Sequence, residues 1–370
     1  MNKIKLGDVV EIISGFAFDS KLFNDSNGMP LIRIRDVKRG YTETFTTEAF
    51  DTKFIVKKDD ILIGMDGEFN LEKWMSEDAL LNQRVCKLIP NENIDKNYIY
   101  FFLPKKLKEI ENKTSFATVK HISIKQIENI EINQIDITKQ KEISKRLLNI
   151  KNIIKNKKIQ LELLTELIKS QFVEFFGDVS VNNKNYKKVK LSEISEYWNG
   201  LTYKPTDVVK DGVIVLRSSN IQNGKLDFKD IVKVNCKIAD KKFVKDKDIL
   251  MCSRNGSARL VGKVALIDEL TEPMSFGAFM MIIRSKYYPY LFSYFETDAF
   301  RNQISTGATT TINQITSNMM NRIELPLPPE NEINEFERIV KLIDKQKFEI
   351  EKSLKEMEEL YDSLMEKYFG

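Results

Sequence analysis

Two long segments of the chain have apolar residues at helical spacing and predict two long helices. Between Thr138 and Phe176 there is no glycine or proline, and apolar side chains recur every seven residues with a second set between them. The segment that ends at Gly370 repeats this pattern. Heptad spacing is typical of a coiled-coil seam, so each segment is expected to form a helix of about 39 residues, roughly 58 Å long. The seam positions are Ile143, Leu147, Ile150, Ile154, Leu161, Leu164, Ile168 and Phe175, then Phe336, Val340, Ile343, Ile350, Leu354, Met357, Tyr361, Leu364 and Tyr368.

The sequence before each long helix has a different periodicity. Residues 1–137 and 185–328 contain short runs of β-branched and aromatic residues, such as PLIRIRDV, DDILIGMDG, VIVLRSSN and AFMMIIRS, separated by Gly, Asn, Asp and Pro. Such runs predict strands, and NYIYFFLPKKLKEIENK, residues 97–113, predicts a helical insert. The expected fold class is therefore α+β, with two tandem mixed domains that are each followed by a long helix.

The chain also contains an internal duplication, which becomes visible when the sequence is compared with itself. KLGDVVEIISGFAF aligns with KLSEISEYWNGLTY at an offset of 185, which pairs Gly15 with Gly200, and Arg33 then pairs with Arg217. From Thr118 to the end the offset stays at 193. Two units with one fold are expected, with domains at 1–137 and 185–328 and helices at 138–177 and 329–370. If the helices pack antiparallel as a coiled coil, a pseudo-twofold axis relates the units, which is the symmetry of a DNA duplex.

The amino-acid composition adds little to these predictions of fold and domain organisation. The chain is 42% hydrophobic and 30% charged, and its net charge of +4 is weak evidence for a nucleic-acid partner. No apolar run is long enough for a signal peptide or a membrane span, so we expect a cytoplasmic protein without a membrane partner. The odd number of cysteines, three, predicts reduced thiols rather than a disulfide framework.

Motifs for catalysis and for nucleotide or metal binding are missing from the sequence. There is no phosphate-binding glycine loop, no C-x-x-C spacing, and one histidine, His121, in the whole chain. Glu111 and Lys113 have the Glu-x-Lys spacing of some nucleases, but such pairs arise by chance in a chain this rich in charge. His121 could act as a general base, although a structural or DNA-facing role fits better. No catalytic residue, metal or cofactor is therefore expected on this chain.

Arginine is scarce, 12 residues against 46 lysines, so its positions are informative. Most arginines of the two domains lie in or beside loops rich in Gly, Asn and Asp, such as IRDVKRGY and CSRNGSARLVG. An arginine can donate two hydrogen bonds to guanine, Asn or Gln can read adenine, and Lys mostly contacts phosphates. The predicted DNA-binding residues are Arg33, Arg35, Lys38, Arg39, Arg84, Lys120, His121, Arg217, Asn220, Arg254, Asn255, Arg259, Thr309 and Asn313.

This order of domain, long helix, domain, long helix resembles the specificity (S) subunit of type I restriction-modification systems. The resemblance covers essentially the whole chain and rests on TTTINQITSNMMNRIELPLPPENE, its counterpart ATVKHISIKQIENIEI, LNQRV, and the helix ends QFVEFFGD and LMEKYFG. The first unit departs from the family, with QIDITKQKE where a Pro-Pro-x-x-Glu-Gln helix entry is common, and the second has Asn331 in place of the Gln. These departures concern the starts of the helices.

The resemblance implies a non-catalytic DNA-recognition subunit. Each domain would be a target recognition domain for one half of a split double-stranded DNA site. The helices would hold two methyltransferase subunits, which bind S-adenosylmethionine, and restriction subunits would join the full complex. The main rival hypothesis is a structural coiled-coil adaptor that does not read DNA, and a second rival is a stand-alone nuclease.

Overall fold

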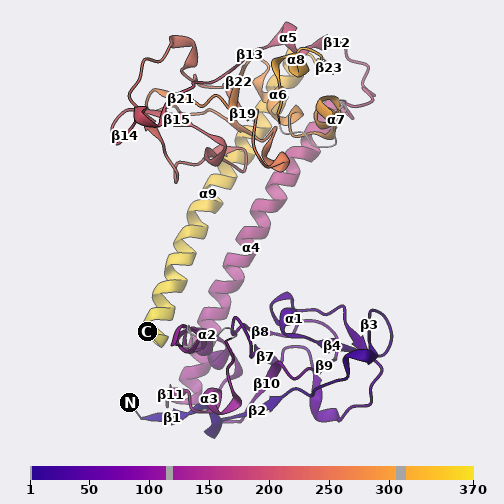
Figure 1. Ribbon diagram of the computed structural model, residues 1–370, viewed down its shortest axis with the longest axis vertical. Coiled ribbons are helices and arrows are strands. Elements are labelled where there is room, and N and C mark those ends of the chain that lie inside the picture. The colour runs from indigo at the N-terminus through magenta and orange to yellow at the C-terminus, as the bar shows by residue number, and fades with distance from the viewer. Residues whose placement is uncertain (1, 114–119, 306–313) are drawn as a thin grey trace. The chain divides into compact units, whose positions relative to one another are not determined.

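The computed structural model describes residues 2–113, 120–305 and 314–370, and its residues fall into two compact units (Figure 1). Unit 1 comprises Met1–Lys158 and Lys352–Gly370, and unit 2 comprises Ile159–Glu351. Each unit thus includes part of both long helices. The boundaries predicted from the sequence, which separate domains from helices, stay a prediction.

Unit 1 is built on an antiparallel four-stranded sheet in the order β2-β10-β7-β8, beside a five-stranded sheet in the order β3-β5-β4-β9-β6. Strands β4 and β9 pair in parallel, and β1 pairs with β11. The strands are β1 Lys3–Lys5, β2 Val10–Ser14, β3 Phe23–Asn24, β4 Met29–Ile32, β5 Phe45–Thr46, β6 Ile55–Val56, β7 Ile61–Gly64, β8 Leu71–Lys73, β9 Ala79–Leu81, β10 Val85–Pro90 and β11 Glu131–Asn133. The helices are α1 Ile34–Arg39, α2 Lys96–Lys113, α3 Ile124–Glu128, the first part of α4 Ile137–Phe176 and the last part of α9 Glu330–Phe369.

Unit 2 has a four-stranded antiparallel sheet in the order β13-β22-β19-β20 and a second sheet in the order β14-β18-β15-β21. Strands β15 and β21 pair in parallel, and β12 pairs with β23. The strands are β12 Lys188–Lys190, β13 Glu196–Asn199, β14 Val208–Val209, β15 Val213–Leu216, β16 Ile221–Gln222, β17 Lys225–Leu226, β18 Lys233–Val234, β19 Ile249–Cys252, β20 Val264–Leu266, β21 Met274–Phe276, β22 Met280–Arg284 and β23 Glu324–Pro326. The helices are α5 Leu191–Ile194, α6 Tyr288–Tyr294, α7 Asp298–Ser305, α8 Ser317–Met320, the last part of α4 and the first part of α9.

The two units repeat one topology, which confirms the duplication. Strands β2, β10, β7 and β8 occupy the places of β13, β22, β19 and β20. The parallel pair β4–β9 corresponds to β15–β21, and the two-stranded pair β1–β11 corresponds to β12–β23. Isolated bridges repeat as well, Phe16 with Asn82 in unit 1 and Leu201 with Gly277 in unit 2. The mixed α+β fold class is thus confirmed.

The two long helices are also confirmed, since α4 and α9 each have 40 residues. All their predicted seam positions are buried or half-buried. In unit 1, Leu147 of α4 shares a hydrophobic core with Phe369 of α9, and Figure 1 shows α2 beside both helix ends. In unit 2, Phe172 of α4 shares a core with Phe336 of α9. Pairing of the helices along their whole length as a coiled coil stays a prediction.

The three cysteines are free thiols, as predicted. Cys86 and Cys252 are buried on interior strands of the two antiparallel four-stranded sheets, and Cys236 is half-buried. Burial raises the pKa of the Cys86 thiol to about 12, so this thiol is protonated and unreactive at neutral pH. Across the described ranges, no helix has the length and hydrophobicity needed to cross a bilayer.

Candidate nucleic-acid interface

Three segments that are distant in sequence meet at one end of the main sheet of unit 1. They are the loop after β7, the turn that precedes β10, and the segment that precedes α3. The Met65 amide donates to the Arg84 carbonyl oxygen at 2.9 Å, and the Ile122 amide donates to the Met65 carbonyl oxygen at 2.9 Å. An antiparallel bridge joins Asp66 to His121. These backbone bonds bring the side chains of Asp66, Arg84 and His121 together.

Glycines permit this close approach of the segments. Gly15 follows β2, and a Cβ atom there would lie 2.1 Å from the Asn82 carbonyl oxygen, which is closer than side chains tolerate. Gly64 ends β7, and a Cβ atom there would lie 3.0 Å from Ile34 Cγ1 at the start of α1. The two glycines therefore allow the turn before β10 to pack against the end of β2, and they allow α1 to lie beside the loop after β7.

The carboxylate of Asp66 lies at the centre of this cluster. It accepts a hydrogen bond from His121 Nδ1 at 2.6 Å through Oδ1 and an ion-pair hydrogen bond from Arg84 Nη1 through Oδ2. Burial opposes its ionisation, but the hydrogen bonds from His121 and Arg84 outweigh burial and lower the pKa of Asp66. The Asp66 side chain is 13% exposed, whereas those of Arg84 and His121 are each 56% exposed. A shielded anion thus orients two exposed nitrogen-bearing side chains.

Two lysines predicted to contact DNA flank the cluster. Lys38 Nζ lies 3.7 Å from Glu68 Oε2 in the loop after β7. Lys120 Nζ lies 3.3 Å from Glu111 Oε1, which also accepts from Lys108 Nζ at 2.9 Å. The hydrogen bonds from Lys108 and Lys120 lower the pKa of Glu111, although burial acts in the opposite direction. Glu111, considered above as part of a nuclease motif, is therefore an ion-pair partner in this structure.

The arginines in and next to α1 are exposed, as is Lys38. Arg33, Arg35 and Arg39 are all exposed. The buried Asp36 fixes the start of the helix, because its carboxylate accepts from the Arg33 amide at 2.9 Å. Arg35 Nη2 donates to Thr44 Oγ1 at 3.3 Å.

Unit 2 repeats the convergence of segments with different side chains. The Ser253 amide donates to the Phe279 carbonyl oxygen at 2.9 Å, and the Ile315 amide donates to the Ser253 carbonyl oxygen at 2.7 Å. A bridge joins Arg254 to Gln314. Backbone bonding therefore makes Arg254, Phe279 and Gln314 the counterparts of Asp66, Arg84 and His121.

The unit 2 surface combines a stacked arginine with amide groups. The Arg254 guanidinium lies 5.2 Å from the centre of the Phe279 ring, and Phe279 is 59% exposed. Gln314 is exposed as well, and Asn255 Nδ2 donates to Ser218 Oγ at 3.1 Å. Guanidinium groups and aromatic faces both stack on nucleobases, and amides hydrogen-bond to adenine.

Of the remaining predicted residues of unit 2, the structure describes Arg217, Asn220 and Arg259. Arg217 pairs with Asp230 at 2.7 Å, and Arg259 is exposed. Asn220 is 1% exposed, and its side chain accepts from the Arg217 amide and donates to the carbonyl oxygens of residues 227 and 230, so it holds the loop together. Thr309 and Asn313 lie outside the described residues.

Asp66, Phe279 and Gln314 were missed by the sequence analysis. A signal did exist, because β7 and β19 align at an offset of 188, which places Asp66 opposite the predicted Arg254. The structure brings the predicted Arg84, Lys120 and His121 together in unit 1, although 36 positions separate Arg84 from Lys120.

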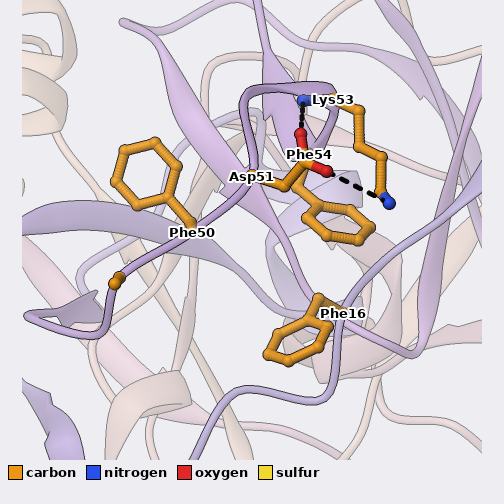
Figure 2. A pocket seen from close by; sticks show the side chains of 6 residues that line it. Phe16, Phe50, Asp51, Lys53 and Phe54 are labelled. Carbon is orange, nitrogen blue, oxygen red and sulfur yellow. Dashed lines mark hydrogen bonds and ion pairs between the residues drawn. The ribbon is translucent and has the colours of Figure 1, made fainter.

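An aromatic hollow lies near the same turn of unit 1. It has a volume of about 390 Å³ and is formed mainly by the rings of Phe16, Phe50 and Phe54 (Figure 2). Asp51 accepts from both the amide and the side chain of Lys53 at its rim. The Gln83 amide donates to the Phe16 carbonyl oxygen at 2.9 Å, which ties the hollow to the turn that carries Arg84.

The duplicated fold with two such surfaces has a match among known protein families. Residues 1–163 and again residues 183–359 match the family described as type I restriction modification DNA specificity domain. The chain belongs to the type I restriction-modification DNA specificity family. The two family matches cover the two copies of the duplicated fold, and thus both candidate surfaces.

Curated members of the specificity family align over much of this chain. The specificity subunit of the type I restriction enzyme EcoBI from Escherichia coli is 31% identical over 72% of this chain and 62% of its own length. The MjaVIII specificity subunit from Methanocaldococcus jannaschii is 22% identical over 96% of this chain and 90% of its own length. The first of these matches therefore spans less than two thirds of the relative.

The fold also resembles a solved member of the specificity family. The S subunit of the type I restriction-modification system from M. genitalium aligns with 100% of this chain and 96% of its own length, with a TM-score of 0.64 and 16% sequence identity. At this identity the likeness concerns the fold alone, and it agrees with the α+β class predicted from the sequence.

Proposed function

We propose that this chain is the DNA specificity subunit of a type I restriction-modification complex, and that each unit reads one half of a bipartite double-stranded DNA site. The observation that supports this most strongly is the repetition of one three-segment surface with different side chains. Asp66, Arg84 and His121 in unit 1 correspond to Arg254, Phe279 and Gln314 in unit 2. One scaffold with two sets of exposed groups suits the recognition of two different half-sites.

The charges of the chain support a division of labour within each surface. A net charge of +4 over 370 residues provides little general attraction to DNA, so binding must depend on local groups. Exposed arginines such as Arg84 and Arg254 can contact base edges, and lysines such as Lys38 can contact phosphates. Sequence preference would then come from few side chains, which makes the proposal testable by substitution.

The proposal includes partner subunits that supply the chemistry. Two methyltransferase subunits would bind to this chain, with S-adenosylmethionine held by them, and restriction subunits would join the full complex in the cytoplasm. The chain itself would be non-catalytic. Within the part that the structure describes, no group of three or more His, Cys, Asp or Glu side chains is placed to hold a metal ion.

Methylation profiling of DNA tests the proposal directly. The chain is co-expressed with a type I methyltransferase subunit that co-purifies with it, and genomic methylation is compared with that of cells lacking the chain. We expect methylation at one bipartite motif only when the chain is present. A matched variant with Arg84→Ala and Arg254→Ala should assemble normally and lose preference in both halves.

Two other outcomes would contradict the proposal. A complex that forms but methylates or binds DNA without sequence preference would favour a structural adaptor. Cleavage of DNA by the purified chain alone in the presence of Mg²⁺ would favour a nuclease. The first result would exclude the DNA-reading role, and the second would exclude the non-catalytic role.

A further inference from the structure

The cluster of Asp66, Arg84 and His121 is specific enough in its hydrogen bonding to indicate what it recognises. Asp66 is ionised and therefore only accepts hydrogen bonds, so the proton that His121 shares with it must lie on Nδ1. In the neutral imidazole this leaves Nε2 as an acceptor. The carboxylate thus selects one tautomer of an exposed histidine.

The same carboxylate fixes the arginine. Nη1 of Arg84 is bound to Asp66 Oδ2, while His121 uses Oδ1. Among the described residues, no other side chain bonds to the remaining guanidinium nitrogens, and the Arg84 side chain is 56% exposed. Arg84 therefore presents two further donors, Nε and Nη2, beside the acceptor of His121.

The order of these groups matches one base pair. In the major groove, a G·C pair offers two acceptors on guanine, N7 and O6, followed by a donor on cytosine, N4. An A·T pair offers an acceptor, a donor, an acceptor and a methyl group. Two adjacent donors followed by an acceptor are complementary to G·C and not to A·T.

We propose that this cluster reads one G·C base pair in the half-site of unit 1. Arg84 donates to guanine N7 and O6, His121 Nε2 accepts from cytosine N4, and Asp66 is the positioning residue for both. The inference rests on the proposed DNA-reading function and adds a base-pair identity to it. Unit 2 has Arg254, Phe279 and Gln314 at these positions, so its half-site need not contain the same pair.

Nuclear magnetic resonance of the free chain tests the role of Asp66 without DNA. Because the chain has one histidine, ¹⁵N spectra contain a single pair of imidazole signals. We expect the neutral ring to carry its proton on Nδ1 in the native chain and on Nε2 in the Asp66→Ala variant. A native ring protonated mainly on Nε2 would overturn the proposal, whether or not the variant folds.

Competition binding tests the base-pair assignment in the complex with methyltransferase subunits. Exchange of residues 1–137 with those of another specificity subunit identifies the half-site read by unit 1, and duplexes then carry each base pair at each of its positions. We expect one position that requires G·C. Arg84→Lys keeps the charge but loses the two-pronged donor, and it should reduce that preference by about 5- to 150-fold at this position alone.

Two further variants complete the design. His121→Phe should weaken the same preference, and Glu92→Gln, which neutralises an exposed carboxylate outside the cluster, should leave it unchanged. Absence of a required G·C pair, or an unaltered preference in Arg84→Lys, would overturn this inference while leaving the proposed function intact. A complex without any sequence preference would instead overturn the proposed function and this inference with it.

Discussion

Substitution of Gly200 by alanine should disrupt unit 2 at the turn that carries Phe279. Gly200 follows β13, and an added Cβ atom would lie 2.0 Å from the Phe276 carbonyl oxygen and 2.4 Å from that of Gly277. Cβ contacts essentially never fall below 3.0 Å, so the backbone must separate by about 1 Å. That movement strains two backbone hydrogen bonds, Gly200 N to Met280 O at 3.1 Å and Leu201 N to Phe276 O at 2.6 Å.

The expected cost follows from these contacts. Overpacking of a close contact costs about 1 to 3 kcal/mol, and each weakened hydrogen bond costs about 1 kcal/mol. The variant should therefore lose about 3 to 5 kcal/mol of unfolding free energy. For a unit of this size such a loss lowers the melting temperature by roughly 6 to 20 °C.

Scanning calorimetry or circular dichroism would measure the effect, and Gly256→Ala is the matched control. Gly256 lies in the loop after β19, has no atom within 4 Å of an added Cβ and does not have a positive φ. Its replacement should leave the melting temperature within about 2 °C of the native value. An equally small change for Gly200→Ala would show that the turn is not held in the way described. In the complex, Gly200→Ala should impair one half-site and spare the other.

Three further predictions concern stability and binding. The Asp248 carboxylate is 1% exposed and forms a bidentate ion pair with Arg284, so Asp248→Ala should lower the free energy of unfolding in urea by about 3 kcal/mol. This loss should be more than three times that of Asp268→Ala, which breaks an exposed ion pair. Replacing Arg254 and Asn255 together by alanine should weaken the base preference at one half-site, by about 1 to 3 kcal/mol for each bidentate contact with a base that is lost. Unchanged methylation specificity would exclude this loop from the DNA-reading surface. Lys38→Ala should weaken binding to all sequences alike and lower the salt slope by about one, as band shifts across salt concentrations would reveal.

The fold was predictable where information in the sequence is local or repeated. The apolar positions of α4 recur at regular spacing, and the structure has two helices of 40 residues where two helices of about 39 residues were predicted. Gly15 and Gly200 were recognisable as a matched pair, but their role was not, because it depends on a carbonyl oxygen more than 60 positions away. Periodicity reports which face of an element is buried, and it does not report which elements meet.

The candidate site was only partly predictable for the same reason. Arginines in loops identified Arg84 and Arg254, whereas Asp66 looked like an ordinary turn residue in the sequence. Its role becomes visible only when the turn before β10 and the segment before α3 are brought beside it. Asn220 shows the opposite error, a residue predicted to contact DNA whose side chain instead holds a loop together. Its sequence context is the same as that of an asparagine that faces a ligand.

Unit 1 is built from two separate stretches of the sequence, and this determines the order in which the two units are completed during translation. Residues 352–370 belong to unit 1, and Phe369 packs within 5.1 Å of Tyr98, measured between ring centres. The unit whose synthesis begins first is thus completed last, after all of unit 2 has emerged from the ribosome. A nonsense mutation at about residue 352 would leave unit 2 largely whole and expose the apolar core of unit 1. Chaperones and proteases that respond to exposed apolar surface would then act on the oldest part of the nascent chain.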